Sequence, residues 1–180
     1  MVDTMVERDG LKGIDILVNN AGYFYEPHET LANMNFEEQI KQIDICGVGP
    51  LRVSKALLMK GLMGSGSKII IISSQAGSVE WRFTQNPEGG DYGHHMSRAS
   101  CNIGAVLLSQ ELKNRSIPVV LLHPGFNRTE MTAKFKEIWD IEGAVDPKVG
   151  AKRVLYEIAR VDMDSSGKFI NCEDGLLIPW

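Results

Sequence analysis

Short runs of Ile, Leu and Val alternate along this chain with segments long enough to be helices, and this alternation limits the possible folds more than any other feature. The aliphatic runs are Asp15 to Asn20 (DILVNN), Lys68 to Ser74 (KIIIISS), Pro118 to His123 (PVVLLH) and Lys168 to Asn171 (KFIN). Strands that are apolar on both faces are typical of parallel sheets covered by helices on each side. We therefore expect a mostly parallel sheet built from these four runs.

The segments between the runs predict the helices that cover this sheet. They are Phe36 to Met63, Asp91 to Lys113 and Pro147 to Ala159, while Glu80 to Gly90 is expected to be a loop. The order strand-helix-strand repeated along the chain indicates an α/β fold. With 180 residues, 43% of them hydrophobic, the chain has the size and composition of a single domain with its own core.

Composition and charge exclude several classes of function. There are 19 basic against 23 acidic residues and a net charge of -4, so the basic excess of a nucleic-acid-binding protein is absent. The cysteines, Cys46, Cys101 and Cys172, are an odd number without a C-x-x-C pair, which favours neither a disulfide framework nor a metal site. No run is long enough to span a bilayer, and the first residues lack a targeting pattern. We expect a cytoplasmic protein by default, or an organellar one if a presequence was removed.

Small polar segments follow the first three aliphatic runs. They are Asn19 to Gly22 (NNAG), Ser73 to Gly77 (SSQAG) and His123 to Thr129 (HPGFNRT). In open parallel sheets, ligands bind at the carboxyl ends of the strands. The pattern therefore predicts a site at this edge of the sheet.

These motifs, in this order, together with GPLRVSKALL before the second run and GHHMSRAS after it, resemble the short-chain dehydrogenase/reductase family, and its C-factor and sniffer-type carbonyl reductase branch in particular. The resemblance covers the chain from Ile14 to its end. It implies a Rossmann-type, doubly wound sheet, a nicotinamide cofactor, and an Asn-Ser-Tyr-Lys tetrad that acts on carbonyls or alcohols.

Carried over to this chain, the tetrad is degenerate. Its Ser falls on Ser74, but its Asn falls on Cys46, and its Tyr and Lys fall on His94 and Arg98. The i, i+4 spacing keeps both side chains on one helix face, where a guanidinium would leave the imidazole neutral. The planar fork of Arg does not replace a compact ammonium. We expect His94 to be an exposed polar helix residue rather than a retuned catalytic acid.

The cofactor-binding part of the family pattern is incomplete. No G-x-x-x-G-x-G motif occurs, and only 18 residues precede Asn19, so the dinucleotide half-fold would be absent if Met1 is the true start. The resemblance places vestigial cofactor contacts at six residues, for which an ordinary tight turn is an equally good explanation. They are Asn20, Ala21, Gly22, Pro124, Gly125 and Thr129. His123 is expected to be a strand residue with satisfied hydrogen bonds, and no metal site is expected.

The favoured hypothesis is a truncated Rossmann-type domain over residues 1–180, a degenerate family member without oxidoreductase activity that serves as a binding, signalling or scaffold subunit and holds no cofactor. The alternative is an NAD- or NADP-dependent carbonyl reductase or alcohol dehydrogenase whose amino-terminal third is missing from this sequence. A third possibility is a processed fragment that acts as a signal.

The missing strands also bear on assembly. In the doubly wound order, the strand Asp15 to Asn20 would lie beside the absent first strand. Uncovered apolar edges invite pairing with other chains. We therefore expect a second copy, a larger assembly, or the first dozen residues to cover this edge.

Overall fold

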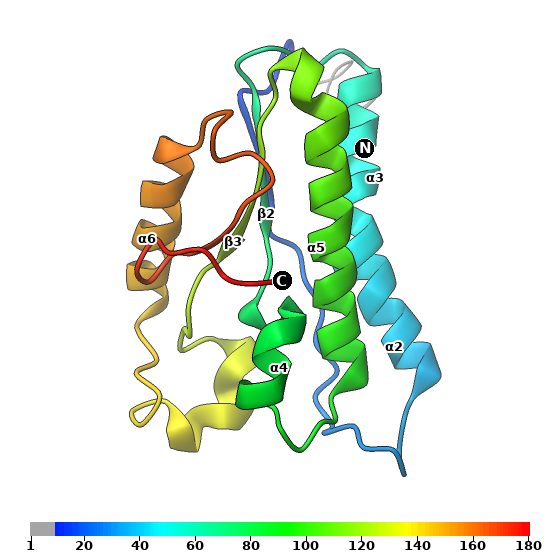
Figure 1. Ribbon diagram of the computed structural model, residues 1–180, viewed down its shortest axis with the longest axis vertical. Coiled ribbons are helices and arrows are strands. Elements are labelled where there is room, and N and C mark those ends of the chain that lie inside the picture. Colours follow the sequence, from blue (N-terminus) through cyan, green and yellow to red (C-terminus); the bar gives the residue numbers. More distant parts are fainter. Residues whose placement is uncertain (1–9) are drawn as a thin grey trace.

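A four-stranded parallel sheet lies at the centre of the structure, a computed structural model that describes residues 10–180 (Figure 1). The strands are β1 (Ile16–Asn19), β2 (Lys68–Ile72), β3 (Val119–His123) and β4 (Phe169–Asn171), and they lie side by side in sequence order. All three strand pairs are parallel. The expected α/β class and the four strands are thus confirmed, with boundaries one or two residues shorter than the aliphatic runs.

The helices follow the expected order, with local departures. The segment expected as one helix from Phe36 is three elements: α2 (Phe36–Ile43), a π-helical turn η1 (Asp44–Val48) and α3 (Gly49–Met59). The others are α5 (Tyr92–Leu112), α6 (Pro147–Arg160), and the short 3₁₀ segments η2 (Gln75–Gly77), η3 (Lys113–Arg115) and η4 (Glu130–Ile138).

The expectation of a loop over Glu80 to Gly90 is wrong in its first half. This part of the chain forms the helix α4 (Val79–Gln85). Its start is fixed by Ser78, whose hydroxyl oxygen accepts a hydrogen bond from the Trp81 N–H at 3.2 Å. This serine cap marks the start of a helix that the polar composition of the segment did not predict.

Two apolar clusters fix the helices to the sheet, one on each face. The larger cluster joins Ile69 and Leu121 to α3 and α5, and the smaller one joins Ile70 and Leu122 to Ile158 of α6. Successive strand residues point to opposite faces, so the unbroken aliphatic runs supply both clusters. Figure 1 shows α3 and α5 on one side of the sheet and α6 on the other.

The two outer strands of the sheet are covered differently. The carboxyl-terminal segment lies along β4, with the Ile178 N–H donating to the Phe169 carbonyl at 2.9 Å. No strand of residues 10–180 lies on the outer side of β1. Ile16 and Val18 are 46% and 42% exposed there. Both project to the face of the sheet that carries Ile70 and α6, and α6 does not extend over them.

Candidate functional site

The turn after β2 packs directly on helix α5, and this contact positions the central residues of the site. A Cβ atom on Gly77 would lie 2.8 Å from the Arg98 carbonyl oxygen and 2.7 Å from the Asn102 Nδ2 atom. Only glycine permits so close an approach. The Ser73 hydroxyl adds a bond of 2.6 Å to the Asn102 side chain. Ser74 and Arg98 are thereby held at the same edge of the sheet.

The guanidinium of Arg98 lies at the carboxyl ends of β1 and β2. Arg98 is only 7% exposed, and its Nη1 donates to the Ile72 carbonyl at 3.4 Å, a long hydrogen bond. Its Nη2 lies against Gly22, where a Cβ atom would be 3.0 Å away. The Nε atom is shielded from solvent and has no hydrogen-bond partner among residues 10–180. No carboxylate of the described chain forms an ion pair with this guanidinium.

His94 lies one turn before Arg98 and is half-buried, so the expectation of an exposed residue is wrong. Its ring meets the Phe24 ring edge to face, with 4.7 Å between the centroids. Burial lowers the pKa of His94 to about 3, and the Arg98 charge acts in the same direction. The imidazole is therefore neutral at physiological pH, as expected beside a guanidinium. Its Nδ1 atom has no partner in the described part of the chain.

His123 ends β3 at the same edge of the sheet. It is 7% exposed, and burial lowers its pKa to about 4, with Arg98 as the second cause. Its Nδ1 atom has no hydrogen-bond partner among residues 10–180. The expectation that His123 has satisfied hydrogen bonds is therefore wrong. The half-buried imidazole of His94, the buried imidazole of His123 and the buried guanidinium of Arg98 thus share the edge.

The remaining tetrad positions are engaged in local structure. The Ser74 hydroxyl oxygen accepts from the Ala76 N–H at 3.2 Å and caps the turn η2. Cys46 lies in the π-helical turn and is 2% exposed. Its sulfur accepts from the Tyr23 N–H at 3.3 Å and donates to the Tyr23 carbonyl at 3.4 Å. Both side chains therefore hold backbone segments in place.

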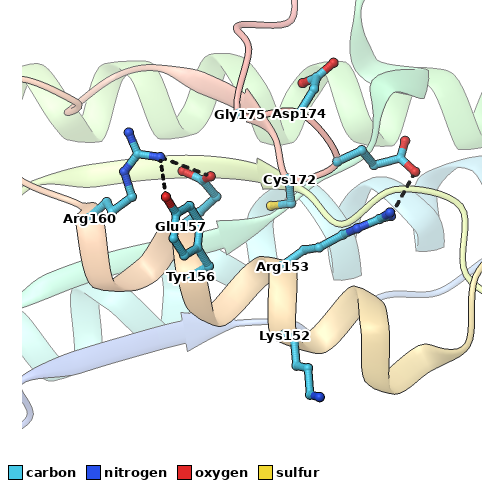
Figure 2. Close-up of a pocket in the computed structure, with 9 residues that line it drawn as sticks. Lys152, Arg153, Tyr156, Glu157, Arg160, Cys172, Asp174 and Gly175 are labelled. Atoms are coloured by element: carbon cyan, nitrogen blue, oxygen red, sulfur yellow. Dashed lines mark hydrogen bonds and ion pairs between the residues drawn. The ribbon is translucent and has the colours of Figure 1, made fainter.

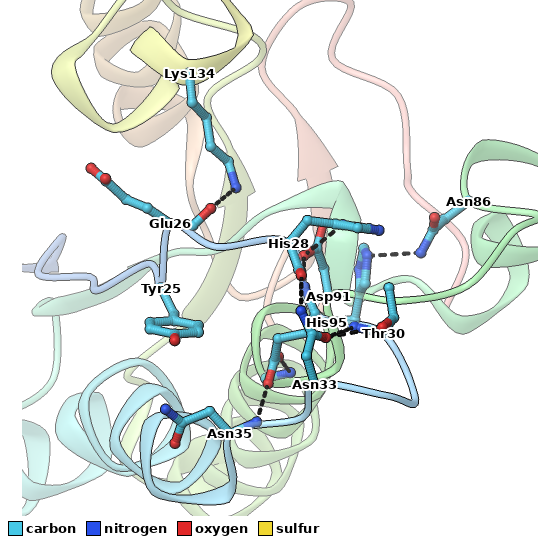
Figure 3. A network of polar contacts seen from close by, with 12 residues as sticks. Tyr25, Glu26, His28, Thr30, Asn33, Asn35, Asn86, Asp91, His95 and Lys134 are labelled. Carbon is cyan, nitrogen blue, oxygen red and sulfur yellow. Dashed lines mark hydrogen bonds and ion pairs between the residues drawn. The ribbon is translucent and has the colours of Figure 1, made fainter.

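Lys134, on η4, is a residue near the site that the sequence analysis missed. Its ammonium donates to the Glu26 carbonyl at 2.8 Å and lies 4.0 Å from the centroid of the Phe24 ring. Figure 3 shows it reaching from η4 toward the segment that follows β1. Burial lowers its pKa. The aromatic residues after NNAG are the only sequence signal, since an aromatic face attracts a cation.

The polar network behind this segment fixes the start of α5. His28 Nδ1 lies 3.1 Å from the Asp91 carboxylate, which also accepts from the Glu29 N–H (Figure 3). The buried Glu29 carboxylate accepts from the Gly93 N–H at 2.8 Å. Asp91 adopts a left-handed conformation, with φ at 46°, and does not cap the helix itself. Glu29 therefore replaces the usual cap and ties the loop to α5.

The six positions matched to cofactor contacts lie in the segments that follow β1 and β3. Gly125 has φ at 82°, and a Cβ atom there would lie 2.6 Å from the Glu173 side chain. Thr129 caps η4 together with Thr132. These turns therefore have structural reasons of their own. No strand followed by a glycine-rich turn and a helix, the usual pyrophosphate cradle, occurs among residues 10–180, so the described residues do not fit a whole dinucleotide.

An open groove of about 430 Å³ lies elsewhere, between α6 and the segment after β4 (Figure 2). Four of its charged groups pair with one another: Arg153 with Glu173 at 3.2 Å, and Arg160 with Glu157 at 3.8 Å. None of the candidate residues lines it. We therefore place the candidate site at the carboxyl ends of β1 to β3, where buried polar atoms lack partners.

Residues 10–180 contain neither a membrane-spanning helix nor a cluster of metal ligands. No helix there combines the length and hydrophobicity needed to cross a bilayer. No cluster of three or more His, Cys, Asp or Glu side chains in this range is arranged to hold a metal ion.

Comparison with known proteins gives the family. Residues 1–138 match the family described as short chain dehydrogenase. The chain belongs to the short-chain dehydrogenase family. It is 29% identical over 167 residues to the C-signal protein of Myxococcus xanthus, covering 93% of each chain. It is also 26% identical over 181 residues to 1-hydroxy-2-glutathionyl-2-methyl-3-butene dehydrogenase of a Rhodococcus strain, covering 75% of that protein.

Solved structures of the short-chain dehydrogenase family share the fold. The carbonyl reductase Sniffer of Drosophila melanogaster superposes with a TM-score of 0.81 at 24% identity, and the match covers 99% of this chain and 71% of that one. The NADPH-bound carbonyl reductase from chicken fatty liver has the same TM-score at 25% identity, with 70% of its chain covered. The expected resemblance to the C-factor and sniffer branch is thus confirmed.

Proposed function

We propose that this short-chain dehydrogenase homologue is a binding, signalling or scaffold subunit without oxidoreductase activity. One observation carries the proposal: the groups at the Tyr and Lys positions of the tetrad are a neutral imidazole and a guanidinium bonded to a strand carbonyl. His94 has a pKa of about 3, so it holds no exchangeable acid proton of suitable strength near neutrality. The Arg98 guanidinium holds the Ile72 carbonyl through Nη1, and its planar fork does not replace the compact ammonium that the family places against the ribose.

Of the other two tetrad positions, Cys46 supports this proposal. The Ser74 hydroxyl oxygen accepts from the backbone of η2, but its O–H is still able to donate to a developing oxyanion. The Cys46 thiol, by contrast, is enclosed by the backbone of Tyr23. A buried thiol cannot anchor a relay water as an amide does. We infer that the chain alone binds no dinucleotide tightly, because the residues described provide no cradle for the pyrophosphate.

The alternative is an NAD(P)-dependent reductase, and the comparisons give it specific support. Several similar proteins are reductases or dehydrogenases by name, and one solved structure is described as NADPH-bound. The chain covers 70% to 75% of those proteins. A segment upstream of residue 1 that supplied the cofactor half would revive this function. His94 and Ser74 would then be the residues on which turnover depends.

A reconstruction experiment separates the two functions. The triple variant Cys46→Asn, His94→Tyr, Arg98→Lys restores the family tetrad. Under our proposal it gives no NADPH-dependent carbonyl reduction in the 180-residue chain and gains turnover only when fused to an upstream cofactor-binding half from a family member. Turnover by the unfused triple variant would refute the importance of the missing cradle, and turnover by the unmodified fused chain would support the alternative.

We also propose that another chain covers the outer side of β1, either a second copy or a different member of an assembly. No strand of residues 10–180 pairs with the outer side of β1, and Ile16 and Val18 are exposed on its face, whereas the opposite edge at β4 is covered by the carboxyl terminus. Natural sheet edges are protected by charge, proline or a covering element. The experiment is amide hydrogen exchange on the purified chain: slow exchange at the β1 amides that point away from β2 supports a covering chain, and free exchange at these amides opposes it.

A further inference from the structure

One edge of the Arg98 guanidinium has no hydrogen-bond partner. In arginine, Nε and Nη2 lie on the same edge of the planar group and form the fork that binds a carboxylate with two parallel hydrogen bonds. Here Nη1, on the other side, donates to the Ile72 carbonyl. Nε is buried without a partner, and Nη2 faces the glycine after β1. The remaining donors, Nε and Nη2, are the pair that would bind a carboxylate.

The charge of Arg98 is also uncompensated within the described residues. Several other arginines have acidic partners: Arg52 lies 2.6 Å from Asp44, and Arg153 lies 3.2 Å from Glu173. Those pairs are exposed or half-exposed, where water would serve nearly as well.

Arg82 and Arg115 donate only to neutral oxygens, but both are more exposed than Arg98. Arg98 is 7% exposed, and its one hydrogen-bond partner among the described residues is the uncharged carbonyl of Ile72. Removing a cation from water without a counterion is costly, so this site favours a negative charge.

Among residues 10–180, no side chain paired with Arg98 carries a negative charge that would repel a bound anion. The neutral imidazoles of His94 and His123 each have an unpartnered Nδ1 atom, which is a potential donor or acceptor. Lys134 adds a second cation beyond the Phe24 ring. The nearby acids act on other groups: Asp91 and Glu26 on Lys134, and Asp174 on His123.

We propose that the Nε–Nη2 edge of Arg98 binds the carboxylate of a small organic acid at the carboxyl ends of β1 and β2. The ring of Phe24, packed on His94, offers an apolar surface to the body of such a ligand. The segment that carries Gly22 and Phe24 has neither helix nor strand, and entry of the acid requires it to open locally against its hydrogen bonds to Cys46 and Lys134. This proposal names the ligand class of the site and rests on the binding function proposed above.

Thermal unfolding of the 180-residue chain in sodium butyrate, sodium phosphate and sodium chloride at equal ionic strength tests the proposal. Butyrate should raise the melting temperature saturably relative to chloride, since a ligand that binds the folded state stabilises it. Isothermal titration should give the same dissociation constant. No stabilisation by butyrate, or stabilisation by phosphate alone, would overturn the assignment of a carboxylate.

Variants at Arg98 make the test specific. Arg98→Met has a similar length but no charge, and it should abolish the butyrate effect while raising the melting temperature of the ligand-free chain, because it removes an unpaired buried cation. Arg98→Lys keeps the charge but loses the fork, and it should raise the dissociation constant of butyrate at least tenfold. This variant provides the test if Arg98→Met fails to fold. A loss of ligand-free stability in Arg98→Met, with butyrate binding retained in either variant, would show a purely structural arginine.

Arg115→Met is the matched control. Arg115 also donates to a backbone carbonyl, that of Met63 at 3.2 Å, but it is exposed and lies outside the site. Its butyrate response should equal that of the unmodified chain, and a lost response would refute a site at Arg98. NADPH turnover in the same samples keeps the two proposals apart: turnover with butyrate binding refutes only the non-catalytic function, and absence of both refutes only the carboxylate site.

Discussion

Replacing His94 by Phe should flatten the dependence of stability on pH below neutrality. In the folded chain burial lowers the pKa of His94 from 6.5 to about 3, and the positive charge of Arg98 adds to the effect. The folded state thus binds no proton at this ring at pH 5, whereas the unfolded chain does. Stability is complete above pH 6.5 and falls as the pH drops from 6.5 toward 3.

The magnitude follows from the difference between the unfolded pKa and the working pH. At pH 5 that difference is about 1.5 units, which corresponds to about 2 kcal/mol of lost stability relative to pH 7.5. The value does not depend on how far below 5 the folded pKa lies. His123, with a pKa of about 4, adds a loss of similar size, which His94→Phe leaves in place.

Urea unfolding followed by circular dichroism at pH 7.5 and pH 5.0 measures this loss. We expect His94→Phe to reduce the difference between the two pH values by about 2 kcal/mol. Phe24→Leu is the companion variant: it keeps the titrating group but reduces its burial, so it should lower the pH difference by no more than His94→Phe does. An unchanged pH difference in His94→Phe would show that this imidazole is protonated in the folded chain, and would remove the main argument against its role as an acid.

Three further substitutions or modifications test other parts of the structure. Gly77→Ala should destabilise the chain by about 1–3 kcal/mol in urea, because the new methyl group would meet the backbone of Arg98, and an unchanged midpoint would refute the close contact of η2 with α5. Val18→Lys should increase the monomeric fraction in light scattering by placing a charge on the exposed strand edge, whereas oligomers that persist at equal concentration would exclude this edge as the contact. The native chain should resist iodoacetamide at pH 8, because burial raises the pKa of Cys101 to about 11 and of Cys172 to about 12; rapid alkylation of either one, mapped by mass spectrometry, would contradict their burial.

The architecture was predictable from the sequence because burial on both faces leaves a strong signal. The runs around Ile70 and Leu121 cannot be half-exposed strands, since they lack polar alternation, and the structure places them between two helical layers. The edge on which the candidate residues gather was predictable for the same reason, since parallel strands end together. The short helix after Ser78 and the segment η4 were missed because their composition is that of a loop.

The environment of individual side chains could not be predicted in the same way. The exposure of His94 depends on Phe24, which comes from a loop some 70 residues earlier in the sequence, and no periodicity reports such a contact. The sequence does predict the sign of the effect of Arg98 on His94, because i, i+4 spacing brings them together. It does not predict that Arg98 would be bonded to Ile72, since that depends on how closely Gly77 allows the turn to approach the helix.

Calorimetric titration of the 180-residue chain with NADPH and with NADH tests the central claim most directly. The claim is that this family member, whose described residues provide no pyrophosphate cradle and which has a guanidinium at the tetrad lysine position, does not work as a reductase by itself. We predict no saturable heat with either dinucleotide at millimolar concentration. A saturable isotherm with a micromolar dissociation constant would contradict the account and favour the reductase.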